Sequence, residues 1–228
     1  MRFLYENRSS NSTEQWISVS DLMSGLMVVF LFIAIIYIQY ATRAFREFED
    51  KFSKYEDIRY KIYLDLKREF DNNLIEWGAE IEKETLTIRF FSPEILFDAG
   101  SATVSPRFQI ILNSFFPRYI NLLKDKYSDW IKEVRIEGHT SSEWIGTLDQ
   151  NEAFIKNMEL SQRRTRNVLM FCLNMPISEK YGAWLRTHMT SNGLSSSRLV
   201  MNGSKEDKIK SRRVEFTIQV KNDYLLNR

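Results

Sequence analysis

Apolar residues are concentrated in one stretch near the N-terminus. Every residue from Leu22 to Ile38 is apolar, apart from Ser24, Gly25 and Tyr37. A helix of about 20 residues spans the roughly 30 Å hydrocarbon core of a bilayer. The stretch is also longer than the apolar region of a signal peptide, which has roughly 7–15 residues. The pattern therefore predicts one uncleaved transmembrane helix.

The flanking residues set the limits of this helix. Trp16 lies at one end and Tyr40 at the other, as in the aromatic belts of membrane interfaces. We expect a transmembrane helix over 16–40, after a polar tail over 1–15. The alternative is a buried core helix, but no other segment is suited to cover it on all sides.

A second pattern follows the apolar stretch. Apolar residues recur at heptad spacing with charged residues between them, and we expect a linker helix over 41–81. These residues are Phe45, Phe48, Phe52, Tyr55, Ile62 and Leu66. Two interpretations remain open: a parallel pair of helices that forms a coiled coil, or a single amphipathic helix packed on its own domain.

The rest of the chain, over 82–228, alternates strand and helix patterns. Strands are expected at 85–91, 131–139, 198–204 and 212–220. Helices are expected at 107–127, with Pro117 marking a kink or break, at 157–173, and at 177–194, ending at Asn192-Gly193. This order predicts an α/β domain, an α+β sandwich, after the membrane helix and its linker.

Composition narrows the possible functions. The net charge is +2, so there is no general electrostatic case for direct binding to nucleic acid. The single cysteine, Cys172, allows no internal disulfide, and its apolar neighbours predict a buried thiol.

Four segments of the C-terminal region resemble the OmpA-like peptidoglycan-binding domain. They are "LFDAGSATVSP", "IEGHTSSE", "NMELSQRRTRNVLMFCL" and "RRVEFTIQV", and they stand in the family's order over roughly Leu86 to Val220. The family's helix motif, Asn-x-x-Leu-Ser-x-x-Arg, is present here as Asn157, Leu160, Ser161 and Arg164. The resemblance implies that this domain binds peptidoglycan.

Such a site recognises the ammonium and the carboxylate at the end of a diaminopimelate side chain. Arg164 matches the family's arginine, whose planar guanidinium suits a carboxylate. The family usually has Asp after the His-Thr pair, whereas this chain has Ser141, which cannot neutralise an ammonium. We consider Glu143 as a substitute for that acid. The alternative is a scaffold that has lost the ligand and serves for dimerisation.

No residue pattern supports an enzyme. His139 has no Ser/His/Asp set or HExxH pattern around it and is expected to be a structural loop histidine. We expect no metal site and no cofactor other than a coupling ion.

One carboxylate interrupts the apolar stretch. Asp21 follows Trp16, Ile17 and Val19, so it lies inside the apolar run. A charged residue costs roughly 2.5–3.5 kcal/mol at the centre of a span, and such residues are functional by default. Ser24 shares its helix face, which suits close packing against a partner helix. We expect Asp21 and Ser24 to form an ion relay; the alternative role for Asp21 is a helix N-cap.

A short tail, one helix with this aspartate, a linker and an OmpA-like domain together resemble MotB-like subunits of ion-driven motors. The segment "WISVSDLMSGLMVVFLFIAIIY" most closely resembles the ZorB family of Zorya anti-phage defence systems. The resemblance implies a stator-like homodimer in the inner membrane, ringed by five copies of a ZorA-like channel subunit. It also implies proton coupling, with Na⁺ as an alternative, and an indirect link to cytoplasmic defence effectors.

The same resemblance implies a cytoplasmic N-terminus and a periplasmic C-terminal domain. The basic residues near the helix favour the opposite orientation, because Arg43, Arg46, Lys51 and Lys54 follow it. Two other functions remain open: a flagellar-type MotB stator subunit, and a passive tether between membrane and cell wall. A passive tether does not need a carboxylate at position 21.

Overall fold

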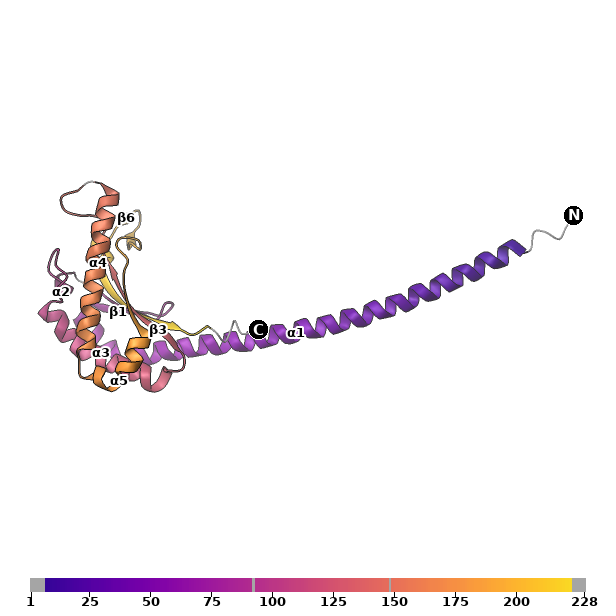
Figure 1. The fold of residues 1–228 in the computed structure, drawn as a ribbon, viewed down its shortest axis with the longest axis horizontal. Coiled ribbons are helices and arrows are strands. Elements are labelled where there is room, and N and C mark those ends of the chain that lie inside the picture. The colour runs from indigo at the N-terminus through magenta and orange to yellow at the C-terminus, as the bar shows by residue number, and fades with distance from the viewer. Residues whose placement is uncertain (1–6, 92, 148, 223–228) are drawn as a thin grey trace. The chain divides into compact units, whose positions relative to one another are not determined.

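The computed structural model describes residues 7–91, 93–147 and 149–222, which form two compact units, 1–54 and 55–228. The first unit is helical throughout its described part, because α1 runs from Asn7 to Trp77 (Figure 1). Its side chains from 16 to 50 are exposed. The expected polar tail at 1–15 is therefore helical from Asn7 onward, and its residues 1–6 lie outside the described part.

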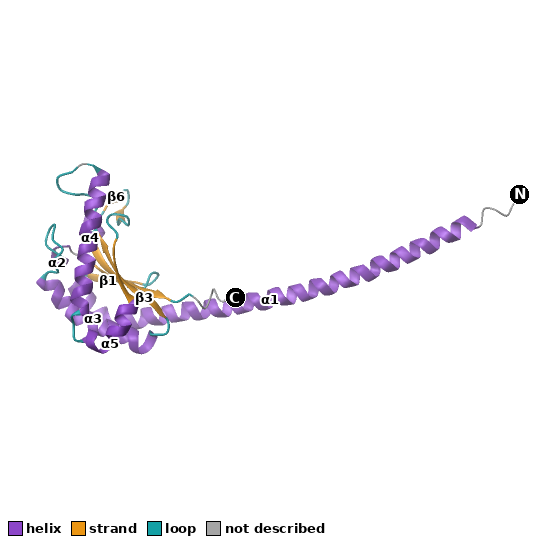
Figure 2. Cartoon of the chain, viewed as in Figure 1, coloured by secondary structure: helices purple, strands orange, loops and turns teal. Residues whose placement is uncertain are grey.

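The second unit contains a five-stranded sheet and the helices packed on it (Figure 2). The strands of this sheet, in spatial order, are β1 (Ala79–Glu82), β2 (Thr87–Phe90), β7 (Arg213–Val220), β3 (Ile131–His139) and β4 (Met189–Gly193). All neighbours are antiparallel except β3 and β4, which are parallel. The helices are α2 (Pro93–Leu96), α3 (Pro106–Tyr127), α4 (Gln150–Leu173), α5 (Ile177–His188) and α6 (Lys208–Ser211).

Alternation along the strands divides the sheet into an apolar and a polar face. Ile136, Val214 and Phe216 lie on the apolar face, within one core cluster that also contains residues of α1, α3, α4 and α5. Glu137 and Glu215 alternate with them and lie on the polar face. The α/β expectation is therefore confirmed: one long apolar N-terminal helix precedes a mixed α/β domain.

The end of α1 belongs to this domain. Ile62, Leu66, Phe70 and Trp77 are buried in its core, and β1 begins at Ala79. The structure thus differs from the expected division at residue 82. Ile62 and Leu66 cannot form part of a seam between two chains, because their own domain already buries them completely.

Two other segments differ from expectation. The helix expected over 177–194 ends at His188, and Met189 to Gly193 form β4, whose backbone pairs with the edge of β3. Gly193 packs so closely on α4 that a Cβ would lie 2.3 Å from the Gln162 backbone nitrogen. The strand expected at 198–204 is reduced to β5 (Met201–Asn202), which pairs with β6 (Lys205–Glu206) in a separate hairpin. Pro117 does not end α3, which continues through it.

Candidate functional site

The five residues proposed to bind peptidoglycan line one cavity of about 620 Å³ in the C-terminal unit. Helix α4 supplies three of them at helical spacing, and the loop after β3 supplies the other two. They are Asn157, Leu160, Arg164, Ser141 and Glu143. Helix α4 begins at its N-cap Asp149, whose carboxylate accepts hydrogen bonds from the backbone amides of Asn151 and Glu152 at 2.7 and 3.0 Å. The start of α4 at Asp149 and the loop after β3 together place these residues around the same cavity.

Arg164 is held firmly at the wall of this cavity. Its Nε donates to the carbonyl of Ser101 at 2.8 Å, and its Nη2 donates to the carbonyl of Asp98 at 3.2 Å. Its guanidinium lies over the Phe97 ring, 4.7 Å from the centroid. Burial, and then the charge of Arg212, lower the pKa of Arg164 to about 10. The side chain therefore remains charged at neutral pH, with its orientation fixed before any ligand binds.

Asn157 shapes the cavity by holding its loop. Its buried Nδ2 donates to the carbonyls of Ser141 and Glu143, at 3.2 and 3.0 Å. Leu160 is also buried and supplies apolar wall. The family's motif thus has two separate tasks here: Asn157 fixes the loop, while Arg164 presents charge.

Glu143, which we considered as a substitute for the family's aspartate, already has a partner in the structure. Ser141 is buried, and its neutral hydroxyl stands where the family usually has an aspartate. The Glu143 carboxylate lines the cavity but forms an ion pair with Lys208. Lys208 therefore competes with a ligand's ammonium for the Glu143 carboxylate, although both side chains are exposed and such a pair is weak.

Sequence reasoning missed one charged residue of this cavity. Arg212 lines it together with Arg164, and its Nε donates to the carbonyl of Lys208 at 3.0 Å. It directly precedes strand β7, at the start of the segment "RRVEFTIQV". Its position beside Arg164 depends on a contact between segments far apart in the chain.

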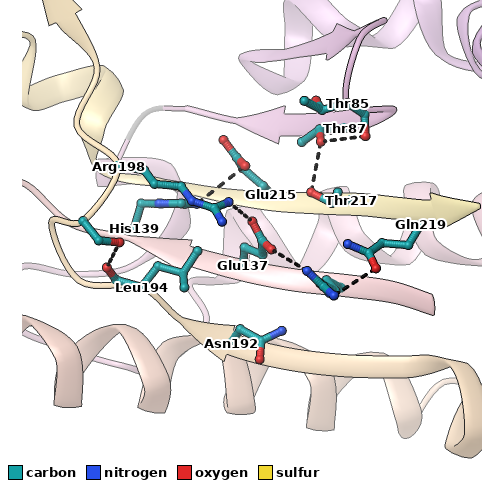
Figure 3. Close-up of polar contacts among 12 residues, drawn as sticks. Thr85, Thr87, Glu137, His139, Asn192, Leu194, Arg198, Glu215, Thr217 and Gln219 are labelled. Atoms are coloured by element: carbon teal, nitrogen blue, oxygen red, sulfur yellow. Dashed lines mark hydrogen bonds and ion pairs between the residues drawn. The ribbon is translucent and has the colours of Figure 1, made fainter. Parts of the chain in front are cut away.

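A buried ionic network lies on the polar face of the sheet (Figure 3). Glu137 and Glu215 are cross-strand partners in β3 and β7, so their charges would repel without compensation. Arg198 Nη1 lies 3.1 Å from Glu137, while Arg89 Nε and Arg213 Nε lie 2.8 and 2.6 Å from Glu215. The two carboxylates are therefore compensated by arginines from several segments.

His139 ends strand β3 inside this network, not in a loop. Its Nε2 lies 3.5 Å from Glu215 Oε2, and burial lowers its pKa. Burial alone would raise the pKa of Glu215, but the neighbouring His139 and the hydrogen-bonded Arg213 lower it to about 2. With Glu137 these residues form a set of possible metal ligands, whose donor atoms lie within 4.8 Å of one another. The arginines already neutralise both carboxylates, so ion pairing accounts for the cluster.

The expected ion-relay residues lie on α1. Within the described residues, α1 is the helix long and apolar enough to cross a membrane, and its most apolar window has a mean hydropathy of 2.4. Asp21 is exposed and lies well inside α1, which begins at Asn7, so the N-cap alternative is wrong. Ser24 Oγ donates to the carbonyl of Ser20 at 2.8 Å.

The mixed α/β domain that follows the apolar helix has the fold of MotB-like proteins. A crystal structure of a MotB-like protein from Desulfovibrio vulgaris has this fold, with a TM-score of 0.55 and 22% identity, and the match covers 74% of this chain and 98% of that one. The cell-wall anchor of the type VI secretion system from Pseudomonas aeruginosa matches with a TM-score of 0.47 and 22% identity over 68% and 97% of the two chains.

Sequence comparison identifies the family. The chain is 42% identical over 212 residues to the Zorya protein ZorB of Escherichia coli strain Crooks, covering 92% of this chain and 90% of that protein. No family model matches the chain. The chain belongs to the ZorB family, as the apolar segment around Asp21 predicted.

Proposed function

We propose that this chain is the stator-like subunit of a proton-driven inner-membrane complex that acts in anti-phage defence. Its membership in the ZorB family supports the defence use over a flagellar one. The observation that carries the mechanism is the position of Asp21, a carboxylate inside an exposed apolar helix. The N-terminus lies in the cytoplasm, and the C-terminal domain lies in the periplasm.

Asp21 takes up and releases the coupling proton, and Ser24 assists it. An unpaired charge in a span is costly, so a neighbouring subunit must cover this face of the helix. A ZorA-like channel subunit, in five copies, provides that surface. The small residues Ser24 and Gly25 next to Asp21 permit the close helix packing that such contact requires. Na⁺ is the alternative coupling ion.

Two copies of the chain associate through the segment that follows the span. Phe45, Phe48 and Phe52 are 61%, 51% and 48% exposed, an unusual amount of aromatic surface on one heptad face. Phe48 and Phe52 already stack on one another, with centroids 6.2 Å apart. Pairing this face with that of a second copy would remove it from water.

The C-terminal domain anchors the complex to peptidoglycan through the cavity around Arg164. A motor that applies torque needs its stator fixed, and a wall-bound domain supplies that reaction force. The fixed guanidinium of Arg164 and the loop held by Asn157 form a preorganised site for a carboxylate.

The test is Asp21→Asn in the full defence system, measured as the efficiency of phage plating. This variant keeps the size of the side chain but removes its titrating charge. We expect protection to be lost while the chain still inserts in the membrane and assembles. Asp50→Asn, an exposed acid on the same helix beyond the apolar stretch, is the matched control and retains protection. Full protection by Asp21→Asn would refute the relay.

A further inference from the structure

Two arginines share the cavity without an acidic partner. Arg164 and Arg212 both line it, and the charge of Arg212 adds to burial in lowering the pKa of Arg164. Arg164 nevertheless remains charged at neutral pH. Two guanidinium groups that line one cavity repel each other, and a bound anion would relieve that repulsion.

The acids that line the cavity do not compensate these charges. They are Asp98 and Glu143. Glu143 is paired with Lys208, and within the described residues Asp98 forms no ion pair with either arginine. Asp98 instead contributes its backbone carbonyl to Arg164. Among the described residues, neither arginine of the cavity therefore has a carboxylate partner.

The position that would hold a ligand's ammonium is also neutral. Ser141 is buried at the cavity wall, with its backbone carbonyl engaged by Asn157. A hydroxyl accepts a hydrogen bond from an ammonium but supplies no charge to offset its desolvation. The site is thus built for one end of a zwitterion and not for the other.

We propose that this cavity binds its ligand as an anion, through a carboxylate held between Arg164 and Arg212, and requires no free amine on that ligand. This inference rests on the proposed function, in which the ligand is a peptidoglycan stem peptide. Crosslinking acylates the side-chain amine of diaminopimelate and leaves the adjacent carboxylate free. The anchor therefore accepts crosslinked and uncrosslinked stems alike, so it can hold a mature wall.

The experiment uses the full chain in detergent micelles and calorimetric titration with three stem tripeptides that end in diaminopimelate. The first has a free side-chain amine and carboxylate, the second has the amine acetylated, and the third has the carboxylate amidated. We expect acetylation to change Kd less than about threefold and amidation to raise it at least about tenfold, because a charge-assisted hydrogen bond is lost.

Variants assign these effects to residues. Arg164→Gln and Arg212→Gln should each raise Kd for the first two peptides by about tenfold or more, whereas the exposed control Arg166→Gln leaves it unchanged. Ser141→Asp should create a preference for the free amine over the acetylated peptide. Circular dichroism checks that each variant is folded.

The outcomes separate the inference from the proposed function. If acetylation weakens binding to the unmutated chain tenfold or more, the amine is recognised and the inference is refuted, while the wall anchor stands. If Arg212→Gln binds like the unmutated chain, the shared carboxylate site is refuted. If neither the peptides nor purified sacculi bind, both the inference and the wall anchor fail.

Discussion

Replacing Phe70 with Ala should cost the C-terminal unit about 3–5 kcal/mol of unfolding free energy, the range for a buried Phe→Ala change. Phe70 lies near the end of α1 and is completely buried. Its ring centroid lies 5.2 Å from that of Phe115 and 6.0 Å from that of Trp77, and the Arg118 guanidinium lies 4.9 Å from it. The loss combines the transfer of the ring to water with the cavity left among these neighbours.

The assay is urea unfolding of residues 55–228, followed by tryptophan fluorescence and circular dichroism. Ile75→Ala is the matched control on the same helix, because Ile75 is 95% exposed, and we expect a change within about 0.5 kcal/mol. Most small domains have about 5–15 kcal/mol of stability, so Phe70→Ala should move the midpoint strongly. A loss no larger than that of Ile75→Ala would refute the conclusion that α1 ends inside the core.

Two further predictions concern titration and assembly. Because burial lowers the pKa of His139, the unfolded chain binds the proton first, and unfolding free energy should fall by up to about 1.4 kcal/mol per pH unit as pH drops below about 6.5. His139→Gln should remove this dependence and His188→Gln should not; stability that rises on acidification would contradict the argument. Phe48→Cys should form a disulfide between two chains under mild oxidation, and Asp50→Cys, on the opposite side of the heptad, should not. Cys172 is buried and does not interfere, and equal crosslinking at both positions would count against the aromatic seam.

Elements with a clear period were predictable from the sequence. Strands β3 and β7 alternate in character, and their expected spans, 131–139 and 212–220, agree with the structure within one residue. Strand β1 directly follows a helix, and Ile81 is the one β-branched residue among its four. Its sequence therefore gives no local indication of a strand. Its pairing with β2 decides its conformation, which no local pattern reports.

Some residues of the candidate site were likewise predictable from a local pattern, and others were not. Asn157, Leu160 and Arg164 are on one helix, so their spacing in the sequence fixes their proximity. The pairing of Glu143 with Lys208 and the approach of Arg212 to Arg164 depend on how separate segments fold together. Sequence motifs could therefore predict the position of the cavity but not which of its charged residues pair with one another.

Helix α1 has an exposed apolar part and, nearer its C-terminal end, a part that is buried in the core of the α/β domain. Its apolar part is exposed along 16–40, whereas Ile62, Leu66 and Phe70 have no exposed surface at all. The end of the helix cannot rotate or slide on its domain without opening that core. Arg118 adds a second constraint, since its Nε donates to Glu69 Oε1 at 2.7 Å and its Nη1 to Asn73 at 3.0 Å. Load applied to the part of α1 that belongs to this unit would therefore reach the sheet through side-chain packing.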